Sequence, residues 1–296
     1  MGGIASSKTE PFAYRGVLCF GEVASQPFAE GSERYAYAVD VRSVRGKQLL
    51  GRMVIKIPKE GSLALDWHIS GSSHAKAQKI VQSFLQDNTT MKLPIAQINV
   101  VPIYGIHIAK MEQKTFLGMR VGEKRGLPTG YELWMEPMLP SFQKFNSNSG
   151  WTDPWFLSMQ ALTHYSFIKS NGYEVLCDLQ GSYDGKSTYS LTDPCVHSID
   201  RKYGSIDLGV MGILKVMALH KCTKACSRLG NIPKQIHKQV IHILSSITGA
   251  NLATARGTSF GFNLHLSPKE QALIQVAYVQ TIIPLVKKIP LFVPSD

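Results

Sequence analysis

The stretch from Cys177 to Gly181 reads Cys-Asp-Leu-Gln-Gly, and Thr192-Asp193-Pro194 follows after a short polar insert. We predict that Asp178 and Gln180, two residues apart on a strand, point to the same face. A carboxylate and an amide oxygen side by side are hard ligands that suit Mg²⁺ at a phosphate. The proline holds Asp193 in an extended conformation, and this second carboxylate could bind metal or accept a hydroxyl proton. Taken singly, each stretch also fits exposed polar residues or an Asp-Pro turn.

Lys56 lies inside Met53-Val-Ile-Lys-Ile57, a predicted strand whose other residues are apolar. Burying an ammonium group is costly unless the group is paired. One interpretation is a lysine held over nucleotide phosphates. The other is an exposed lysine on the solvent face of a sheet, and the strand alone does not decide between them.

His220, Cys222 and Cys226 form a compact group of metal-ligand residue types. Thiolate and imidazole suit Zn²⁺, and a structural zinc site needs four ligands, so a fourth must come from elsewhere in the chain. The alternative is two buried cysteines and a surface histidine. Because the cysteine count of five is odd, the sequence favours a metal site in a reducing compartment over a disulfide framework.

The 296 residues are 44% apolar and carry a net charge of +11. Excess positive charge attracts polyanions such as nucleic acid, an acidic membrane face or phosphate groups, although a solvated basic surface is the plain alternative. We find no uninterrupted apolar stretch of about 18 residues and no signal peptide, so we predict a cytoplasmic protein. Residues 1–6, Met-Gly-Gly-Ile-Ala-Ser, fit the myristoylation pattern with Gly2 as acceptor, or form a flexible terminus. One acyl chain gives only weak membrane association unless a basic surface helps.

The order of elements favours an α+β fold with a β-rich first half, rather than alternating βαβ units. Strands are expected within 12–60, 99–108 and 131–135, a helix at 73–87, and a hinge loop at 146–150. We expect a helix start at 152–154 and a hairpin around Ser170-Asn171-Gly172. Later helices are expected at 213–229, capped by Gly230, along the stripe from Ile232 to Ile247, and from the capping box at 267–270.

These clusters follow one another in an order that resembles the alpha-kinase family, over about Pro27 to Gly230. Asp-Leu-Gln-Gly, Thr-Asp-Pro-x-x-His-Ser and the cysteine group carry the resemblance. It implies a bilobal protein-kinase-like fold with a β-rich N-lobe, a mixed C-lobe and a structural zinc. It also implies a serine/threonine kinase that uses ATP and Mg²⁺ on a protein substrate, with no nucleic acid as partner. We expect a flexible terminus at 1–11, a kinase domain at 12–230 with its lobes divided near 145/146, and extra helices at 231–296.

The resemblance assigns a role to each matching position. Lys56, Asp178 and Asp193 are the implied catalytic residues, and either aspartate could be the base. ATP and Mg²⁺ are expected at Arg34, Lys56, Glu136, Asp178 and Gln180. His164 is the implied fourth zinc ligand, beside His220, Cys222 and Cys226. The glycine loop that shapes the substrate groove corresponds to Tyr203 to Met211 and Gly212, including Gly204, Asp207 and Gly209.

Two departures leave alternatives open. Asp207 stands where the family usually has asparagine, and no acidic partner for Lys56 is found between Asp66 and Asp87. A nucleotide-binding pseudokinase scaffold is therefore the second reading. A zinc-containing nucleic-acid-binding protein is the third, although no base-reading motif is present.

Overall fold

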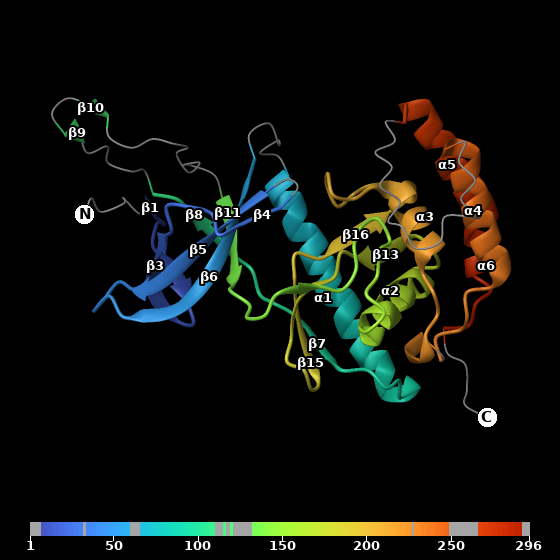
Figure 1. Cartoon of the computed structure of the whole chain (residues 1–296), viewed down its shortest axis with the longest axis horizontal. Coiled ribbons are helices and arrows are strands. Elements are labelled where there is room, and N and C mark those ends of the chain that lie inside the picture. Colours follow the sequence, from blue (N-terminus) through green and yellow to red (C-terminus); the bar gives the residue numbers. More distant parts are fainter. Residues whose placement is uncertain are drawn as a thin grey trace. The chain divides into compact units, whose positions relative to one another are not determined.

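The structure is a computed structural model. It describes residues 7–31, 34–59, 66–109, 115–116, 119–120, 132–226, 228–248 and 266–291. The chain forms two compact units, one of Met1–His68 with Val101–Met138 and the other of Ile69–Val100 with Leu139–Asp296. Each unit is described by itself below, and Figure 1 labels their elements. The loop 146–150 lies inside the second unit.

The first unit is an eight-stranded sheet in which every pair is antiparallel. Its central path runs β1-β3-β5-β6-β11-β8, with β2 on β3 and β4 on β5. A separate ribbon pairs β9 with β10. The strands are β1 (Ser7–Lys8), β2 (Phe12–Tyr14), β3 (Val17–Val23), β4 (Ala29–Glu30), β5 (Arg34–Ser43), β6 (Leu49–Pro58), β8 (Tyr104–His107), β9 (Thr115–Phe116), β10 (Met119–Arg120) and β11 (Glu132–Pro137).

Alternation along β5 and β6 sorts their side chains onto two faces, because successive residues of a strand point in opposite directions. One face forms the buried core of this unit, with Val39 and Val41 from β5 and Met53 and Ile55 from β6. The strands predicted near 35–44 and 49–57 are thereby confirmed. Lys56 lies on the opposite face of β6, because the polar residues of a half-buried strand take the face that does not pack on the core.

The second unit combines two small sheets with six α-helices among its described residues. Strands β12-β14-β15-β7 form one sheet, in which β15 and β7 are parallel, and β13 pairs with β16 in the other. The elements are α1 (Asp66–Met91), β7 (Gln97–Val100), β12 (Gln143–Lys144), α2 (Leu157–Lys169), β13 (Glu174–Cys177), β14 (Gln180–Tyr183), β15 (Thr188–Thr192), β16 (Cys195–Ser198), α3 (Gly209–Leu219), the 3₁₀ turn η1 (Lys224–Cys226), α4 (Lys234–Thr248), α5 (Pro268–Thr281) and α6 (Ile283–Val286). None of the described helices is long and apolar enough to cross a membrane.

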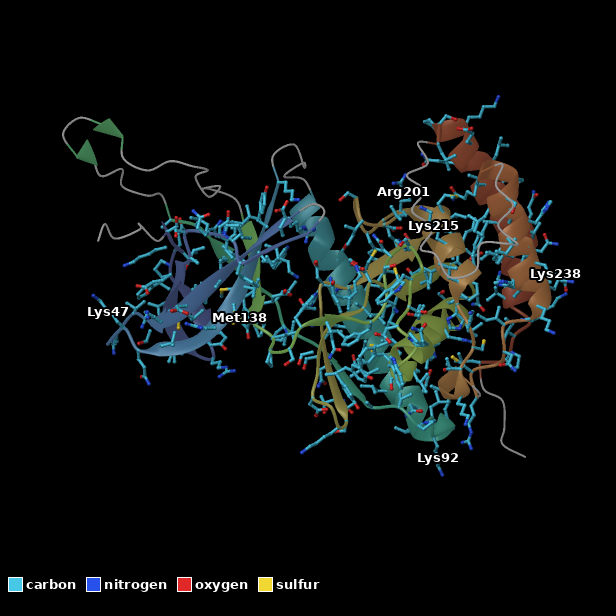
Figure 2. All side chains as sticks on the ribbon, viewed as in Figure 1. Lys47, Lys92, Met138, Arg201, Lys215 and Lys238 are labelled. Atoms are coloured by element: carbon cyan, nitrogen blue, oxygen red, sulfur yellow. The ribbon has the colours of Figure 1, made fainter. Side chains whose placement is uncertain are left out.

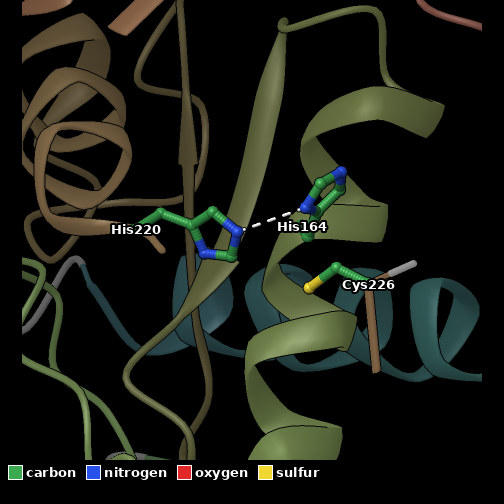
Figure 3. A group of neighbouring side chains, drawn as sticks. All are labelled: His164, His220 and Cys226. Atoms are coloured by element: carbon green, nitrogen blue, oxygen red, sulfur yellow. Dashed lines mark hydrogen bonds between the residues drawn. The ribbon is translucent and has the colours of Figure 1, made fainter. Parts of the chain in front are cut away.

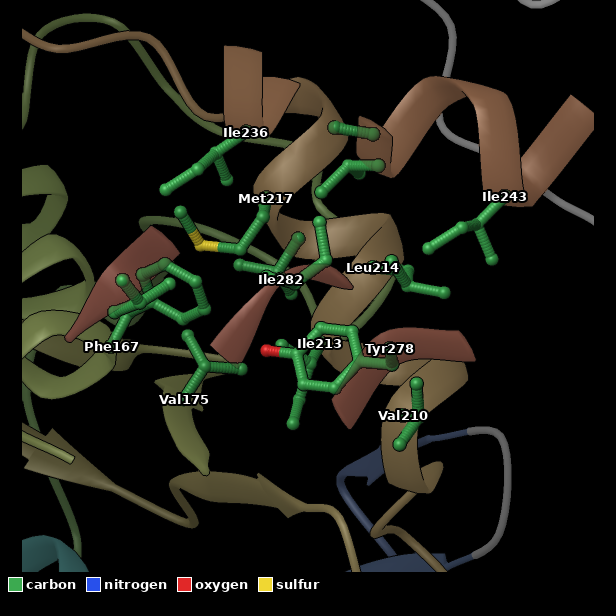
Figure 4. Packing of buried hydrophobic residues seen from close by; sticks show 14 of the residues in the cluster. Phe167, Val175, Val210, Ile213, Leu214, Met217, Ile236, Ile243, Tyr278 and Ile282 are labelled. Atoms are coloured by element: carbon green, nitrogen blue, oxygen red, sulfur yellow. The ribbon is translucent and has the colours of Figure 1, made fainter. Parts of the chain in front are cut away.

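Helix α3 is buried along most of its length, which its almost wholly apolar sequence predicts. Its Ile213, Leu214 and Met217 pack against α4 and against Tyr278 of α5 (Figure 4). Helix α5 begins with the predicted capping box, in which Ser267 and Glu270 satisfy each other's backbone N–H groups. Helices are thus present after residue 230.

Two local predictions for residues 152–172 are wrong. Ser170-Asn171-Gly172 does not turn a hairpin, because the residues before it form α2 rather than a strand. Asn171 and Gly172 have φ of 54° and 83°, values that end a helix as readily as they turn a hairpin. Helix α2 starts at Leu157, later than the predicted start at 152–154. Asp153 instead accepts a hydrogen bond from Trp155 N in the turn before the helix.

The predicted helix 213–229 is also shorter than expected. Helix α3 ends at Leu219, and His220 is its C-cap in an extended conformation. Cys222 therefore lies in a loop and Cys226 in η1, so the two thiols do not share a helix face. Gly230 has φ of 69° but does not cap this helix.

Gly181 is required by the strand pairing of β14 and β15. Its φ is 146°, and a Cβ there would overlap the Ser190 carbonyl oxygen. We expect Gly181→Ala to lower the free energy of unfolding by about 3 kcal/mol or more, because strain and overlap add. Gly185→Ala is the control: its φ is 75° but a Cβ meets nothing within 4 Å, so about 1 kcal/mol is expected. Denaturant melts measure both, and equal losses would refute the steric argument.

Candidate active site and metal centre

Lys56 forms an ion pair with Glu136 of β11. Lys56 Nζ lies 2.7 Å from Glu136 Oε1, and the two side chains are 21% and 10% exposed. Glu136 is directly opposite Val54, which places it diagonally across from Lys56 on the same face of the sheet. The acidic partner that the sequence left unassigned is thus a residue already predicted for the site, and the antiparallel pairing of β6 with β11 was the missing information.

Arg34 and two alanines share this face of the first unit. Ala36 is directly opposite Lys56, and Ala38 is opposite Val54. Arg34, two residues before Ala36, points to the same side. The two small side chains leave an apolar surface that suits a flat ring. The paired lysine and the arginine beside it are cations that suit phosphates.

The resemblance also implies that residues 27–34 form a turn over the nucleotide phosphates, and this segment is only partly described, since residues 32–33 lie outside the described residues. What is described is β4, whose Ala29 and Glu30 pair with Ala36 and Tyr35. The chain therefore folds back tightly onto the first residues of β5.

Asp178 and Asp193 lie at one break between two ladders of the second unit. Cys177 pairs with Cys195 before the break, and Gln180 pairs with Thr192 after it. Both aspartates have positive φ, 52° and 49°, where the chain leaves one sheet for the other, so the prediction that Asp193 is extended is wrong. Two residues that are 15 apart in the sequence are therefore brought to the same crossing point.

Asp178 is not on a strand, so the argument that placed it on one face with Gln180 does not hold. Instead, Lys144 links them: it is directly opposite Gln180, and its Nζ lies 2.8 Å from Asp178 Oδ1. Asn146 holds the segment in place, because its Oδ1 accepts a hydrogen bond from Leu179 N at 2.8 Å.

The Asp178 carboxylate fits a divalent cation. Its Oδ1 is buried and makes no hydrogen bond of good geometry with the described residues, although the Lys144 ammonium is close. The Lys144 ammonium, 2.8 Å away, already compensates the charge of this oxygen, so the fit to a cation rests on the oxygen ligands present rather than on an unsatisfied atom. Mg²⁺ prefers such oxygens, and Gln180 and Asp193 offer more of them nearby.

His164, His220 and Cys226 converge at a second centre (Figure 3). Their ligand atoms all lie within 4.8 Å of one another, and all three residues are buried. His164 Nδ1 is 3.2 Å from His220 Nε2 and 3.6 Å from Cys222 Sγ. Helix α2, the α3 C-cap and η1 thus bring three of the four predicted ligand residues together, and the fourth, Cys222, is exposed and reaches the group through its contact with His164.

The chemistry of this group fits a metal. His164 Nε2 lies 3.0 Å from Gly230 O, so Nε2 carries the proton and Nδ1 faces the cluster with a free lone pair. Burial lowers the pKa of His220, which keeps its imidazole neutral. Hydrogen bonding from Cys226 lowers the pKa of Cys222 and favours its thiolate. Two neutral imidazoles and two cysteines are a donor set that suits Zn²⁺.

Asp207 organises the predicted glycine loop. It is fully buried, and its carboxylate accepts hydrogen bonds from Ser198 N and Oγ, Tyr203 N and Gly209 N. All four partners are donors, so a carboxylate suits this position where an amide would present its own N–H groups. Gly204 and Gly209 have φ of 87° and 67°, and a Cβ on Gly212 would overlap the His197 ring. The loop therefore has a well-packed structure despite its departure from the family pattern.

A third cluster, Cys177, Cys195 and His197, also has metal-ligand spacing. Its atoms are already satisfied: Cys195 Sγ donates to Ile206 O, and His197 Nδ1 accepts from Leu208 N. His197 Nε2 lies 2.9 Å from Asn148 O. These residues hold the glycine loop against β16. The Thr-Asp-Pro-x-x-His-Ser motif in the sequence did not predict this structural role.

The alpha-kinase family model matches residues 29–226. The chain is 39% identical over 92 residues to alpha-protein kinase vwkA of Dictyostelium discoideum, covering 30% of this chain and 15% of that protein. It is 28% identical over 247 residues to myosin heavy chain kinase D of the same organism, covering 73% and 25%. Human eukaryotic elongation factor 2 kinase is 33% identical over 93 residues, covering 30% and 12%.

Solved structures agree with the family match. The alpha-kinase domain of myosin heavy chain kinase A in complex with ADP has a TM-score of 0.55 and 20% identity, covering 77% of this chain and 97% of that chain. Its complex with AMP-PNP has a TM-score of 0.56 at the same identity and covers 77% and 95%.

This chain belongs to the alpha-kinase family and has the alpha-kinase fold, which confirms the resemblance read from the sequence. It spans a quarter or less of the length of the three curated relatives described above.

Proposed function

We propose that this chain is an ATP-dependent protein kinase that transfers the γ-phosphate to serine or threonine of a protein substrate. Family membership supports this, as do relatives that are named kinases and neighbours solved with ADP and AMP-PNP. The observation that carries the proposal is the Lys56–Glu136 ion pair on a sheet face of small apolar residues. A lysine held by a carboxylate is oriented in advance, which phosphoryl transfer requires because catalysis there is mainly positioning and charge neutralisation.

In this proposal Lys56 and Arg34 contact phosphate oxygens, and Glu136 orients Lys56. Asp178 and Gln180 supply oxygen ligands to Mg²⁺, which when bound neutralises phosphate charge. One of the two aspartates at the break orients the substrate hydroxyl and takes its proton, and both remain candidates. Convergence of Lys56 and the aspartates around one nucleotide stays a prediction.

We further propose a structural role for zinc at His164, His220, Cys222 and Cys226. Four protein ligands leave no open coordination position, so no substrate or water can be activated there. The centre joins α2 to the segment that follows α3, and so stabilises the helical side of the second unit.

The test is transfer of labelled phosphate from Mg²⁺-ATP to a generic protein substrate by the purified full chain. Lys56→Ala is expected to reduce transfer about a hundredfold, because one preorganised charge is lost. Arg52→Ala is the matched control, since Arg52 lies on the same strand and the same face and is 68% exposed. We expect it to leave transfer within about twofold.

Other outcomes separate the rival functions. ATP binding without any transfer by the wild type would favour the pseudokinase scaffold. Steeply salt-dependent nucleic-acid binding without ATP binding would favour the zinc-containing nucleic-acid binder. Normal transfer by Lys56→Ala would refute the role given to the ion pair.

A further inference from the structure

Positive charge is concentrated in the last third of the chain. Residues 208–296 contain ten lysines and arginines but two acidic residues, whereas the whole chain has 32 and 21. Most of the net charge of +11 therefore comes from this segment. The proposed kinase activity does not account for this excess of positive charge.

Helix α4 directs its lysines away from the protein. Ile236 and Val240 are buried against α3, while Lys234 and Lys238 are exposed on the opposite side of the helix. Figure 2 labels Lys238. The spacing of four residues stacks the two ammonium groups one turn apart. The sequence of α4 is thus amphipathic with a cationic outer face.

Helix α5 adds apolar groups and a further cation on its exposed side. Ile274 and Tyr278 are buried, whereas Leu273 and Val276 are 61% and 51% exposed, and Lys269 lies one turn before Leu273. The acidic residue of this helix, Glu270, is engaged in the capping box. The exposed side is therefore cationic and apolar together.

The two helices present these sides in one layer. Both α4 and α5 contact α3 and each other, so their exposed sides point away from α3 (Figure 1). Lys287 and Lys288 follow α6, which continues directly from α5, and both are exposed. Lys287 lies over the Tyr173 ring, 5.8 Å from its centroid, so we define the basic face as Lys234, Lys238, Lys269 and Lys288.

No lysine of the basic face forms an ion pair with any described residue, while elsewhere in the same unit Lys76, Lys144 and Lys169 each pair with a carboxylate. Unpaired like charges on neighbouring helices repel one another, and a polyanion relieves this repulsion. The face therefore complements an extended anionic surface.

We propose that the basic face binds the surface of a bilayer containing anionic phospholipids. Lysines are point charges that suit a diffuse anionic surface, whereas nucleic-acid recognition favours arginine and exposed aromatic rings. Leu273 and Val276 can enter the interfacial region between headgroups, as the apolar side of a peripheral helix does.

The test is co-sedimentation of the full, unacylated chain with phosphatidylcholine vesicles that contain about one third phosphatidylserine, or none. Binding to the anionic vesicles is expected, weakening as salt is raised. Lys234→Glu, Lys238→Glu and Lys288→Glu together should lower the apparent affinity about tenfold or more, since each lysine is worth several-fold.

The matched control changes the same charge elsewhere: Arg45→Glu, Lys79→Glu and Lys186→Glu, all at exposed positions. It should keep affinity within about threefold, and both triple variants should keep the wild-type Tm. Equal loss in both triples would overturn the proposal in favour of net charge alone. Equal binding to neutral vesicles would also overturn it. The proposal would likewise be overturned if the basic face bound polyuridylate or polyglutamate but not vesicles.

Discussion

Replacing Asp178 by asparagine is expected to reduce phosphate transfer from ATP about a thousandfold or more. The change removes a negative charge and a metal-binding oxygen while keeping the shape of the side chain. Asparagine also tolerates the φ of 52° at this position, which alanine does not, so the backbone at the break should survive. The buried Oδ1 beside Lys144 is the atom whose charge is being tested.

Asp184→Asn is the matched control for this experiment. Asp184 is in the turn at the far end of the same β14–β15 hairpin, where its carboxylate accepts hydrogen bonds from the backbone N–H groups of Lys186, Ser187 and Thr188. Asparagine can accept the same bonds, so transfer is expected within about twofold of wild type. Initial rates at saturating Mg²⁺-ATP measure both. An Asp178→Asn enzyme with more than about a tenth of the wild-type rate would show that this carboxylate is not needed.

Local patterns in the sequence were enough to predict the strands β5 and β6 of the first unit. Alternation along 35–44 and 49–57 predicts which side chains face the core, and it leaves Lys56 on the other face. Alternation does not reveal which strand pairs with β6. That strand is β11, which lies some 80 residues later in the chain. Glu136 was assigned to the nucleotide by resemblance, yet its pairing with Lys56 is a property of strand order.

The second unit shows why periodicity alone misassigned some elements. Residues 158–168 are all buried, so α2 has no polar face to mark a helical period, and the Asn-Gly that ends it is typical of hairpins too. Likewise, the proposed zinc ligands come from a helix, a cap, a loop and a 3₁₀ turn. Tertiary packing rather than spacing on a helix brings their ligand atoms together, so the residue types could be predicted but their arrangement could not.

Cys226→Ser is expected to remove bound zinc and to lower the Tm by about 10 °C or more. Serine has nearly the size of cysteine but is a poor zinc ligand, so the variant tests coordination rather than packing. Metal ligation in small zinc sites contributes many kcal/mol to folding, and each kcal/mol shifts the Tm of a domain this size by roughly 2–4 °C. Metal analysis should give about one zinc per wild-type chain and far less in the variant.

Cys19→Ser provides the matched control, because Cys19 is equally buried but lies on β3 in the first unit. It introduces the same hydroxyl without touching the cluster, and we expect a fall of no more than about 5 °C with zinc content unchanged. Chelation should then destabilise the wild type and Cys19→Ser alike but leave Cys226→Ser unaffected. If the wild type contains no zinc, or if chelation shifts all three equally, the cluster is a hydrogen-bonded core group without metal.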